Sequence, residues 1–233
     1  MITTVFFDAG ATLLTTAADE GCVFAQLAAD LDVKLEPEVV NRHVPHMYEF
    51  YEQLYEQDDS FWSDDIRAKA IWIEMYELLS RLVGVPIELQ KQLSEKVYAY
   101  YFSPGAWQVF SDVVPTLEAL KAKGVQMGII SNWDSSLAAI IDGLGLKHYF
   151  NHIIASAEVS AHKPMPQIFK LALERLGVTA AQSVHVGDHL LADVAGAAAV
   201  GITPVLIDRT GKHTDANVLR VEDLRQLPGL ISQ

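Results

Sequence analysis

Short apolar runs recur along the chain, and each of them ends at a polar residue or at a turn. They are four to six residues long and rich in β-branched and aromatic residues, a pattern typical of buried strands. They cover residues 2–7, 125–130, 152–155, 183–186 and 203–207. The first run stops abruptly at Asp8, so it predicts a strand with an acid at its carboxyl end.

Helical patterns of apolar residues alternate with these runs. They cover residues 113–123, 135–144, 166–176 and 190–200. In the third pattern, Ile168, Leu171 and Ala172 recur at the spacing that gives a helix one apolar face. Strands that alternate with helices predict an α/β fold with a doubly wound parallel sheet.

Residues 17–102 interrupt this alternation, because they show helical spacing and no convincing strand. The expected helices cover residues 20–31, 37–57, 64–82 and 86–102, and Ser103, Pro104 and Gly105 form a plausible return hinge. The pattern therefore predicts a core of residues 1–16 and 103–233 with a helical insertion of residues 17–102.

Two aromatic stripes lie within the insertion. Such stripes usually pack against neighbouring helices, so we expect packing more often than a wall around a substrate. They contain Tyr48, Tyr51 and Tyr55 in one case and Tyr98, Tyr100, Tyr101 and Phe102 in the other. His43 and His46 have the spacing of a metal pair, but no third ligand follows, so we expect no metal site there.

Composition narrows the classes of partner. Thirty acidic and seventeen basic residues give a net charge of −13, which opposes binding to nucleic acid. Cys22 has no second cysteine to pair with, and we expect it to pack as an apolar side chain. No Lys or Arg precedes Lys34, and the uncharged stretch 194–207 is too short to span a membrane. We expect a cytoplasmic protein with neither a membrane nor a nucleic-acid partner.

Polar residues follow four of the expected strands. Because the carboxyl ends of parallel strands meet at one edge of the sheet, we expect these side chains to converge on one crevice. They are Asp8, Thr12, Ser131, Asn132, Lys163, Asp188 and Asp193. Each of them alone has an ordinary structural interpretation, such as a helix cap or a solvated lysine, but together they indicate a site.

The charges of this set predict its ligands. Three carboxylates and one ammonium leave two excess negative charges, which are costly to gather in a crevice unless a cation joins them. Oxygen ligands of this kind favour Mg²⁺, and Lys163 and Ser131 are able to hold phosphate oxygens. The residues therefore predict a site for Mg²⁺ and a phosphoryl group.

Four segments resemble, in order, the four motifs of the haloacid dehalogenase-like (HAD) hydrolases. They are FFDAGATL at 6–13, GIISN at 128–132, HKP at 162–164, and VGD at 186–188 with Asp193. The resemblance covers about residues 1–15 and 105–210, and residues 131–134 and 186–193 most resemble the REG-2-like subgroup, which contains HAD-like hydrolase domain-containing protein 3. It implies a Rossmann-like core, and it identifies the helical insertion as the cap of the family.

The resemblance also implies roles for the residues. Asp8 would attack phosphorus to form an aspartyl-phosphate, and Lys163 and Ser131 would act with it. The residues that would contact the substrate are Thr12, Ser131, Asn132 and Lys163. Those that would bind the metal are Asp8, the Gly10 carbonyl and Asp188, and Asp193 would support them. Thr12 would also support the first loop. The expected activity is Mg²⁺-dependent hydrolysis of a small phosphorylated molecule.

One position departs from the pattern. Family phosphatases carry a second aspartate two residues after the nucleophile, and this chain has Gly10 there. Loss of a general acid and base typically costs ~10²–10⁴ in rate. A substrate hydroxyl, His189 or a water held by Asp193 would have to substitute. Ala11 also stands where many members have glycine.

The Gly10 departure leaves three alternatives. The first is a protein that binds a phosphorylated ligand or partner with negligible turnover. The second is dehalogenation, although the dehalogenases of the family carry an aromatic residue at the position of Gly10 and lack an acid that matches Asp188. The third is phosphonate cleavage, which needs a Schiff-base lysine in the cap, such as Lys34 or Lys69.

Overall fold

The computed structural model describes residues 1–214 and 217–231, and it places β1 (Thr4–Phe7) at the centre of a six-stranded sheet. β1 pairs in parallel with β4 (Gln126–Ser131) on one side and with β6 (Ser183–Gly187) on the other. The order is β5-β4-β1-β6-β7-β8, and every pairing is parallel. The outer strands are β5 (His152–Ala155), β7 (Thr203–Ile207) and β8 (Leu219–Val221).

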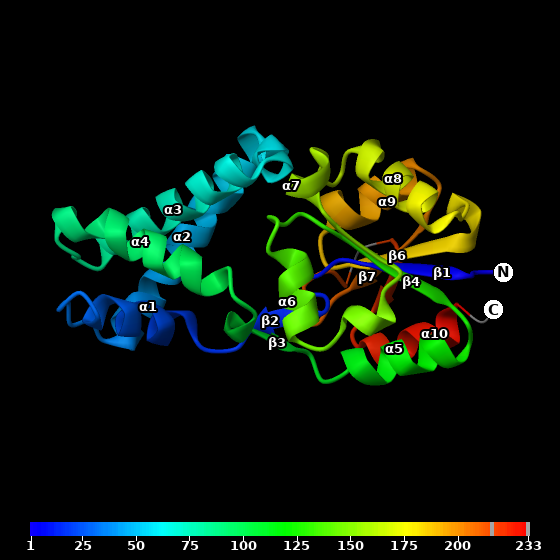
Figure 1. Cartoon of the computed structure of the whole chain (residues 1–233), viewed down its shortest axis with the longest axis horizontal. Coiled ribbons are helices and arrows are strands. Elements are labelled where there is room, and N and C mark those ends of the chain that lie inside the picture. Colours follow the sequence, from blue (N-terminus) through cyan, green and yellow to red (C-terminus); the bar gives the residue numbers. More distant parts are fainter. Residues whose placement is uncertain (215–216, 232–233) are drawn as a thin grey trace.

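Helices cover both faces of the sheet because the side chains of β1 alternate between two apolar layers. Val5 and Phe7 pack with α5 (Val113–Ala122), α6 (Leu137–Gly143) and α10 (Leu227–Leu230). Phe6 packs on the opposite face with α8 (Pro166–Leu176) and α9 (Gly196–Ala199). Figure 1 shows α5 and α10 on one side of the sheet and α8 and α9 on the other. The predicted doubly wound, Rossmann-like fold is confirmed.

All five predicted strands are present, with ends shifted by up to two residues. β8, the short α7 (Ser156–Val159) and an antiparallel pair of β2 (Leu14–Thr16) and β3 (Trp107–Val109) had no clear signal in the sequence. The predicted helix over 190–200 is present over residues 190–199, but its first part, Leu190–Ala195, is π-helical and only α9 is α-helical. His189 caps this turn, and its Nδ1 accepts the backbone N–H groups of Leu191 and Ala192.

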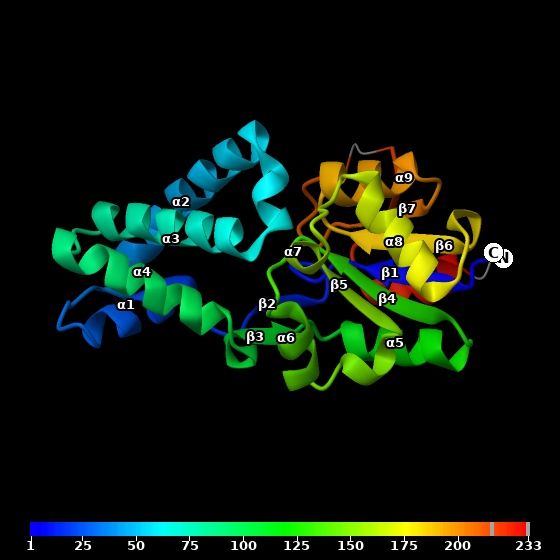
Figure 2. The ribbon, with the colours of Figure 1, turned by 45° about the horizontal axis from the view of Figure 1, so that its top comes forward.

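Four helices between β2 and β3 lie at one end of the molecule, beyond the carboxyl ends of the strands (Figures 1 and 2). They are α1 (Glu20–Ala29), α2 (Pro37–Gln57), α3 (Asp65–Leu82) and α4 (Ile87–Tyr101). They enclose an apolar core of their own, which includes Phe24, Met47 and Leu79. This separate apolar cluster supports the proposed division into a cap of residues 17–102 and a core domain of residues 1–16 and 103–233. Positions 215–216 and 232–233 of the core domain lie outside the described residues.

Cys22 does not pack as expected, since its side chain is exposed on α1. Val23, Phe24 and Ala28 form the buried stripe of that helix, and Cys22 falls outside the stripe. Within residues 1–214 and 217–231, no helix combines the length and the apolar character needed to cross a membrane.

An ion pair joins the loop after β1 to the carboxyl side of the sheet. Arg209, which follows β7, donates to both carboxylate oxygens of the buried Asp112 at 2.8 and 3.1 Å. The same guanidinium donates to the main-chain oxygens of Ala11 (3.2 Å) and Thr12 (2.7 Å). Asp112 also accepts the backbone N–H of Leu224 at 2.8 Å. The pair therefore fixes the segment that follows Asp8.

Replacing Asp112 by alanine should lower the free energy of unfolding by about 3 kcal/mol, because it leaves a partly buried guanidinium and a buried N–H without their partner. Urea unfolding measures the difference. The control is Asp142→Ala, which breaks the exposed Asp142–Lys147 pair and should cost less than about 0.5 kcal/mol. Equal losses in the two variants would contradict the structural role of Asp112.

Candidate active site

The residues predicted from the four motifs meet at the carboxyl edge of the sheet. Asp8 follows β1, Ser131 ends β4 and Asp188 follows β6. β1 lies between β4 and β6, so this edge is the point where the winding of the sheet reverses. Crevices at such switch points are the usual binding sites of doubly wound sheets.

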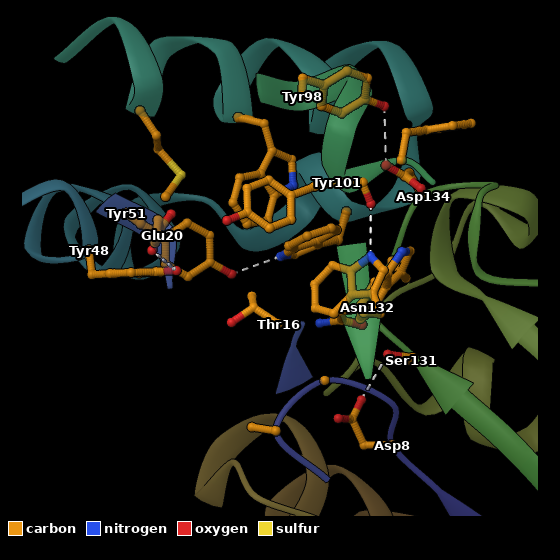
Figure 3. A pocket seen from close by; sticks show the side chains of 18 of the residues that line it. Asp8, Thr16, Glu20, Tyr48, Tyr51, Tyr98, Tyr101, Ser131, Asn132 and Asp134 are labelled. Carbon is orange, nitrogen blue, oxygen red and sulfur yellow. Dashed lines mark hydrogen bonds between the residues drawn. The ribbon is translucent and has the colours of Figure 1, made fainter. Parts of the chain in front are cut away.

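Asp8 is fixed through one of its carboxylate oxygens. Oδ1 accepts hydrogen bonds from Ser131 Oγ at 2.9 Å and from Lys163 Nζ at 2.6 Å. Oδ2 has no hydrogen-bond partner among the described residues, and Figure 3 shows the Asp8 carboxylate at the base of a cavity. Burial raises the pKa of Asp8, and the charge of Lys163 opposes the rise. One oriented, unengaged oxygen is the geometry that a nucleophile needs.

Lys163 is buried between two aspartates. Its Nζ lies 2.6 Å from Oδ1 of Asp8 and 2.5 Å from Oδ1 of Asp193. Burial alone would lower the pKa of Lys163, but the charges of Asp193 and Asp8 raise it above its ordinary value. Lys163 is therefore an ammonium, held at a fixed place beside the nucleophile.

Asp193 has three hydrogen-bond partners, of which Lys163 is one. Oδ1 also contacts His185 Nε2 at 2.8 Å, and Oδ2 accepts the backbone N–H of His189 at 3.0 Å. Burial would raise the pKa of Asp193, but Lys163 and His185 lower it below its ordinary value. Asp193 thus orients Lys163, and of its two oxygens only Oδ2 keeps an acceptor position.

Asp188 completes a cluster of three acids. Oxygens of Asp8, Asp188 and Asp193 lie within 4.8 Å of one another. Burial, followed by the charges of Asp8 and Asp193, raises the pKa of Asp188 to about 7. A nearby cation would reverse that rise, so the donor set fits a metal ion.

Two of the three acids have oxygens that are free to bind such an ion. Asp193 is engaged by Lys163, so Asp8 and Asp188 are the carboxylates with free oxygens. The Gly10 carbonyl accepts the N–H of Thr12 at 2.5 Å and keeps a second lone pair. Thr12 Oγ1 lies 3.4 Å from Oδ1 of Asp188 and supports it from the side of the first loop.

Asn132 joins the motif at β4 to the motif of Lys163. Its Nδ2 donates to the Lys163 carbonyl at 2.9 Å, and its Oδ1 accepts the Lys163 N–H at 2.7 Å. Both ends of the amide are therefore engaged with the main chain of Lys163. The predicted contact between Asn132 and substrate stays a prediction.

Trp133 occupies the space beside Gly10. A Cβ atom at position 10 would lie 3.4 Å from the edge of the Trp133 ring. The ring packs on Trp107 at a centroid distance of 4.7 Å, and its Nε1 donates to Ser136 at 3.1 Å. Ala11 takes a left-handed conformation with φ of +52°, as glycine does in many members of the family. Sequence reasoning missed Trp133, since nothing in the chain relates it to Gly10.

The cap also touches the core at places that the sequence did not indicate. His162 lies between Ser63 Oγ (2.7 Å from Nδ1) and Asp59 Oδ1 (2.9 Å from Nε2). Ser156 Oγ donates to the Trp62 carbonyl at 2.6 Å. At the opposite rim, Tyr98 donates to Asp134 at 3.1 Å. These contacts hold the cap over the acid cluster.

A cavity of about 350 Å³ lies between cap and core, with Asp8 and Ser131 at its base. Ten of its twenty lining residues are aromatic. Tyr48, Tyr51, Tyr98, Tyr101 and Phe102 line it, so the expectation that both aromatic stripes serve packing alone is wrong. Helical spacing places these rings on common faces, but the docking of the cap decides that the faces border a cavity.

Other candidates from the sequence stand apart from this site. The rings of His43 and His46 lie 5.7 Å apart on α2, and the acid cluster at Asp8 is the group with metal-ligand geometry in the described part of the chain. Lys34 and Lys69 are both exposed, which does not suit the buried Schiff-base lysine of phosphonate cleavage.

Comparison with known proteins agrees with the motifs. The chain is 38% identical to haloacid dehalogenase-like hydrolase domain-containing protein 3 of Danio rerio over 56% of the chain and 54% of that relative, so it spans about half of the relative's length. It is 30% identical to glyceraldehyde 3-phosphate phosphatase of Methanopyrus kandleri over 96% of the chain and 91% of that protein.

A solved structure of similar shape is 2-haloacid dehalogenase from Pseudomonas syringae, with a TM-score of 0.67, 29% identity, and coverage of 100% of this chain and 99% of that one. The predicted subgroup is supported by the Danio rerio relative. Residues 2–201 match the haloacid dehalogenase-like hydrolase family, and the chain therefore belongs to that family of hydrolases.

Proposed function

We propose that this chain hydrolyses phosphate monoesters of small molecules through Asp8, with Mg²⁺ as cofactor. The observation that carries the proposal is the state of the Asp8 carboxylate. Lys163 and Ser131 fix one oxygen, and the other is open toward the cavity beside the acid cluster. A relative that aligns over nearly the whole chain is named a glyceraldehyde 3-phosphate phosphatase, which agrees with a small phosphorylated substrate.

Asp8 performs the first step. Its Oδ2 attacks phosphorus, the bond from phosphorus to the leaving oxygen breaks, and an aspartyl-phosphate forms. Lys163 and Ser131, which contact Asp8 in the free enzyme, stabilise the charge on the phosphoryl oxygens. Mg²⁺, held by Asp8, Asp188 and the Gly10 carbonyl, would supply further charge neutralisation. A water then releases phosphate and restores Asp8.

The leaving oxygen needs a proton that Gly10 does not supply. Asp193 is poorly placed to hold a catalytic water, because its side chain is buried and already contacts Lys163, His185 and the His189 N–H. His189 remains, since its Nδ1 accepts two backbone N–H groups and the proton of a neutral ring is then on Nε2. His189 lines a second hollow beside Lys163 and Asp188, so we propose that its Nε2–H donates a hydrogen bond to the leaving oxygen, whose proton comes from a substrate hydroxyl or from water.

The cap has the role of selecting substrate and excluding water. Residues 17–102 supply eight of the ten aromatic side chains of the cavity, the last of them Phe102, and the core supplies Trp107 and Trp133. The cytoplasmic location inferred from composition remains a prediction.

A second candidate is dehalogenation. The ring of Trp133 lies beside Gly10, where the dehalogenases of the family carry an aromatic residue, and a solved dehalogenase has a similar structure. Asp188 and the acid cluster favour phosphate hydrolysis over this candidate. Release of halide from 2-chloropropionate without Mg²⁺ would establish dehalogenation, and negligible turnover with tight phosphate binding would establish the binding-protein alternative.

Asp8→Asn should reduce phosphate release from p-nitrophenyl phosphate by at least about 10³-fold, since it removes the nucleophile and keeps the shape. The assay measures inorganic phosphate with Mg²⁺ present. Asp142→Asn, an exposed site on α6, serves as the control with unchanged turnover. Full activity of the Asp8 variant would refute the proposal.

Removing the metal should abolish turnover, and adding Mg²⁺ should stabilise the fold. At ~100 times its Kd, the ion adds about 2.7 kcal/mol of stability, which a thermal melt registers as a rise of several degrees. In Asp188→Asn this rise should disappear. In EDTA, the melting temperature of the variant should equal or exceed that of the wild type, because the substitution removes one of three clustered carboxylates. An Mg²⁺-dependent rise that persists in the variant would remove Asp188 from the metal site.

Gly10→Asp should raise phosphate release, by up to about 10²-fold, because it restores a general acid and base. The backbone at Gly10 is not left-handed, so aspartate is compatible with it, but the Trp133 ring limits the carboxylate. The double variant Gly10→Asp with Trp133→Ala tests whether the ring blocks the gain. If neither variant exceeds the wild type, the proton comes from another group.

A further inference from the structure

The cavity has two chemically different ends (Figure 3). Asp8 and Ser131 lie at the end formed by the sheet, and Glu20 lies at the end formed by the cap. Aromatic side chains form most of the wall between them. A phosphorylated molecule with its phosphoryl group at Asp8 therefore extends its leaving group toward Glu20.

Glu20 is held in a defined orientation. It begins α1, where its Oε1 accepts the hydroxyl of Tyr76 at 3.0 Å and its Oε2 accepts the hydroxyl of Tyr48 at 3.1 Å. Burial raises the pKa of Glu20, and the two phenol donors oppose the rise. A carboxylate accepts about four hydrogen bonds, so Glu20 retains acceptor positions for a ligand.

Glu20 has no positive partner in the described part of the chain. No Lys, Arg or His is among the described residues that line the cavity, and Glu20 takes part in no ion pair there. Asp134, which lines the cavity on the side opposite Glu20 (Figure 3), adds a second acid. A partly buried carboxylate without a cation loses some of its hydration, and a ligand that brings the cation compensates for that loss.

The walls suit a cation as well. The rings of Trp72 and Tyr76 are nearly parallel, with centroids 6.0 Å apart, and the rings of Tyr76 and Tyr101 are nearly parallel at 6.2 Å. Faces of Trp and Tyr attract ammonium groups within about 6 Å of the ring centroid, and most strongly where water is excluded. Carboxylate and aromatic faces together form the usual receptor for an organic cation.

The lining disfavours the other common leaving groups. A leaving group with a carboxylate would meet Glu20 and Asp134 with no arginine or lysine to pair with it. A polyhydroxylated leaving group has hydrogen-bond partners in the tyrosine hydroxyls, but it brings no positive charge to Glu20. An uncharged apolar group would contact the aromatic side chains but would bring no positive charge to Glu20.

We propose that the substrate is the phosphate monoester of an amino alcohol, whose ammonium group binds against Glu20 and the rings of Tyr48 and Trp72. The inference rests on the proposed function for the position of the phosphoryl group. It assigns to Glu20 the recognition of the leaving group, apart from the chemistry at Asp8.

Binding tests the cation site without catalysis. All four tryptophans of the chain line the cavity, so their fluorescence reports its occupancy. We titrate the whole protein, without Mg²⁺, with choline and its uncharged isostere 3,3-dimethylbutan-1-ol, and with ethanolamine and propan-1-ol. At least one cation should bind about 10-fold or more tightly than its neutral match. Equal affinities within both pairs would overturn the proposal.

Glu20→Gln should remove that preference while the neutral alcohols bind as before. The matched control is Glu38→Gln, which removes an exposed glutamate from the first turn of α2 and should keep the preference. A thermal melt checks folding, and the wild-type ligand pairs decide the question even if the Glu20 variant unfolds. A preference that survives in folded Glu20→Gln would contradict the assignment.

Hydrolysis separates this inference from the proposed function. With Mg²⁺, phosphocholine or phosphoethanolamine should show a kcat/KM at least about 10-fold above that of 3,3-dimethylbutyl phosphate, and Glu20→Gln should reduce the ratio toward one through KM. Turnover of p-nitrophenyl phosphate without any preference for a cation refutes the amino-alcohol substrate alone. Absence of turnover with every ester, together with a cation preference in binding, refutes the proposed function alone.

Discussion

The buried ammonium of Lys163 is the interaction on which the site depends. It lies between Asp8 and Asp193, within 2.6 Å of each. Without this ammonium, the carboxylates of Asp8, Asp188 and Asp193 would share one crevice with no positively charged side chain to balance them. Asn132 fixes the main chain of Lys163 and Asp193 fixes its side chain, so the ammonium has one position. That position in turn fixes Oδ1 of Asp8 and leaves Oδ2 unengaged among the described residues.

The first loop depends on a second, more distant ion pair. Arg209 holds the carbonyls of Ala11 and Thr12 while it pairs with buried Asp112. The left-handed conformation of Ala11 is thereby kept in place, although an alanine takes it less easily than a glycine does. The loop can thus direct the Gly10 carbonyl toward the acid cluster even though two of its residues differ from the common pattern of the family.

Core and cap divide the chemistry between them. The core supplies the charged groups around Asp8, and those groups are the ones that a phosphoryl transfer requires. The cap supplies most of the aromatic wall and the acid Glu20, which have no part in breaking a bond to phosphorus. His162 and Ser156 join the two parts next to Lys163, so the closure of the cap and the geometry of the site are physically linked.

The sequence by itself determined five of the strands, the helical insertion and the residues at the carboxyl edge, because the period of apolar residues and the topology of a parallel sheet are local or general rules. Only the tertiary structure decided that Trp133 fills the space beside Gly10 and that Lys163 and His185 both contact Asp193. It also decided that the tyrosine stripes border a cavity. Those outcomes depend on how the cap docks and on which partners compete for one carboxylate. Contacts between residues distant in the chain carry no periodic signal, so no pattern along the sequence contains them.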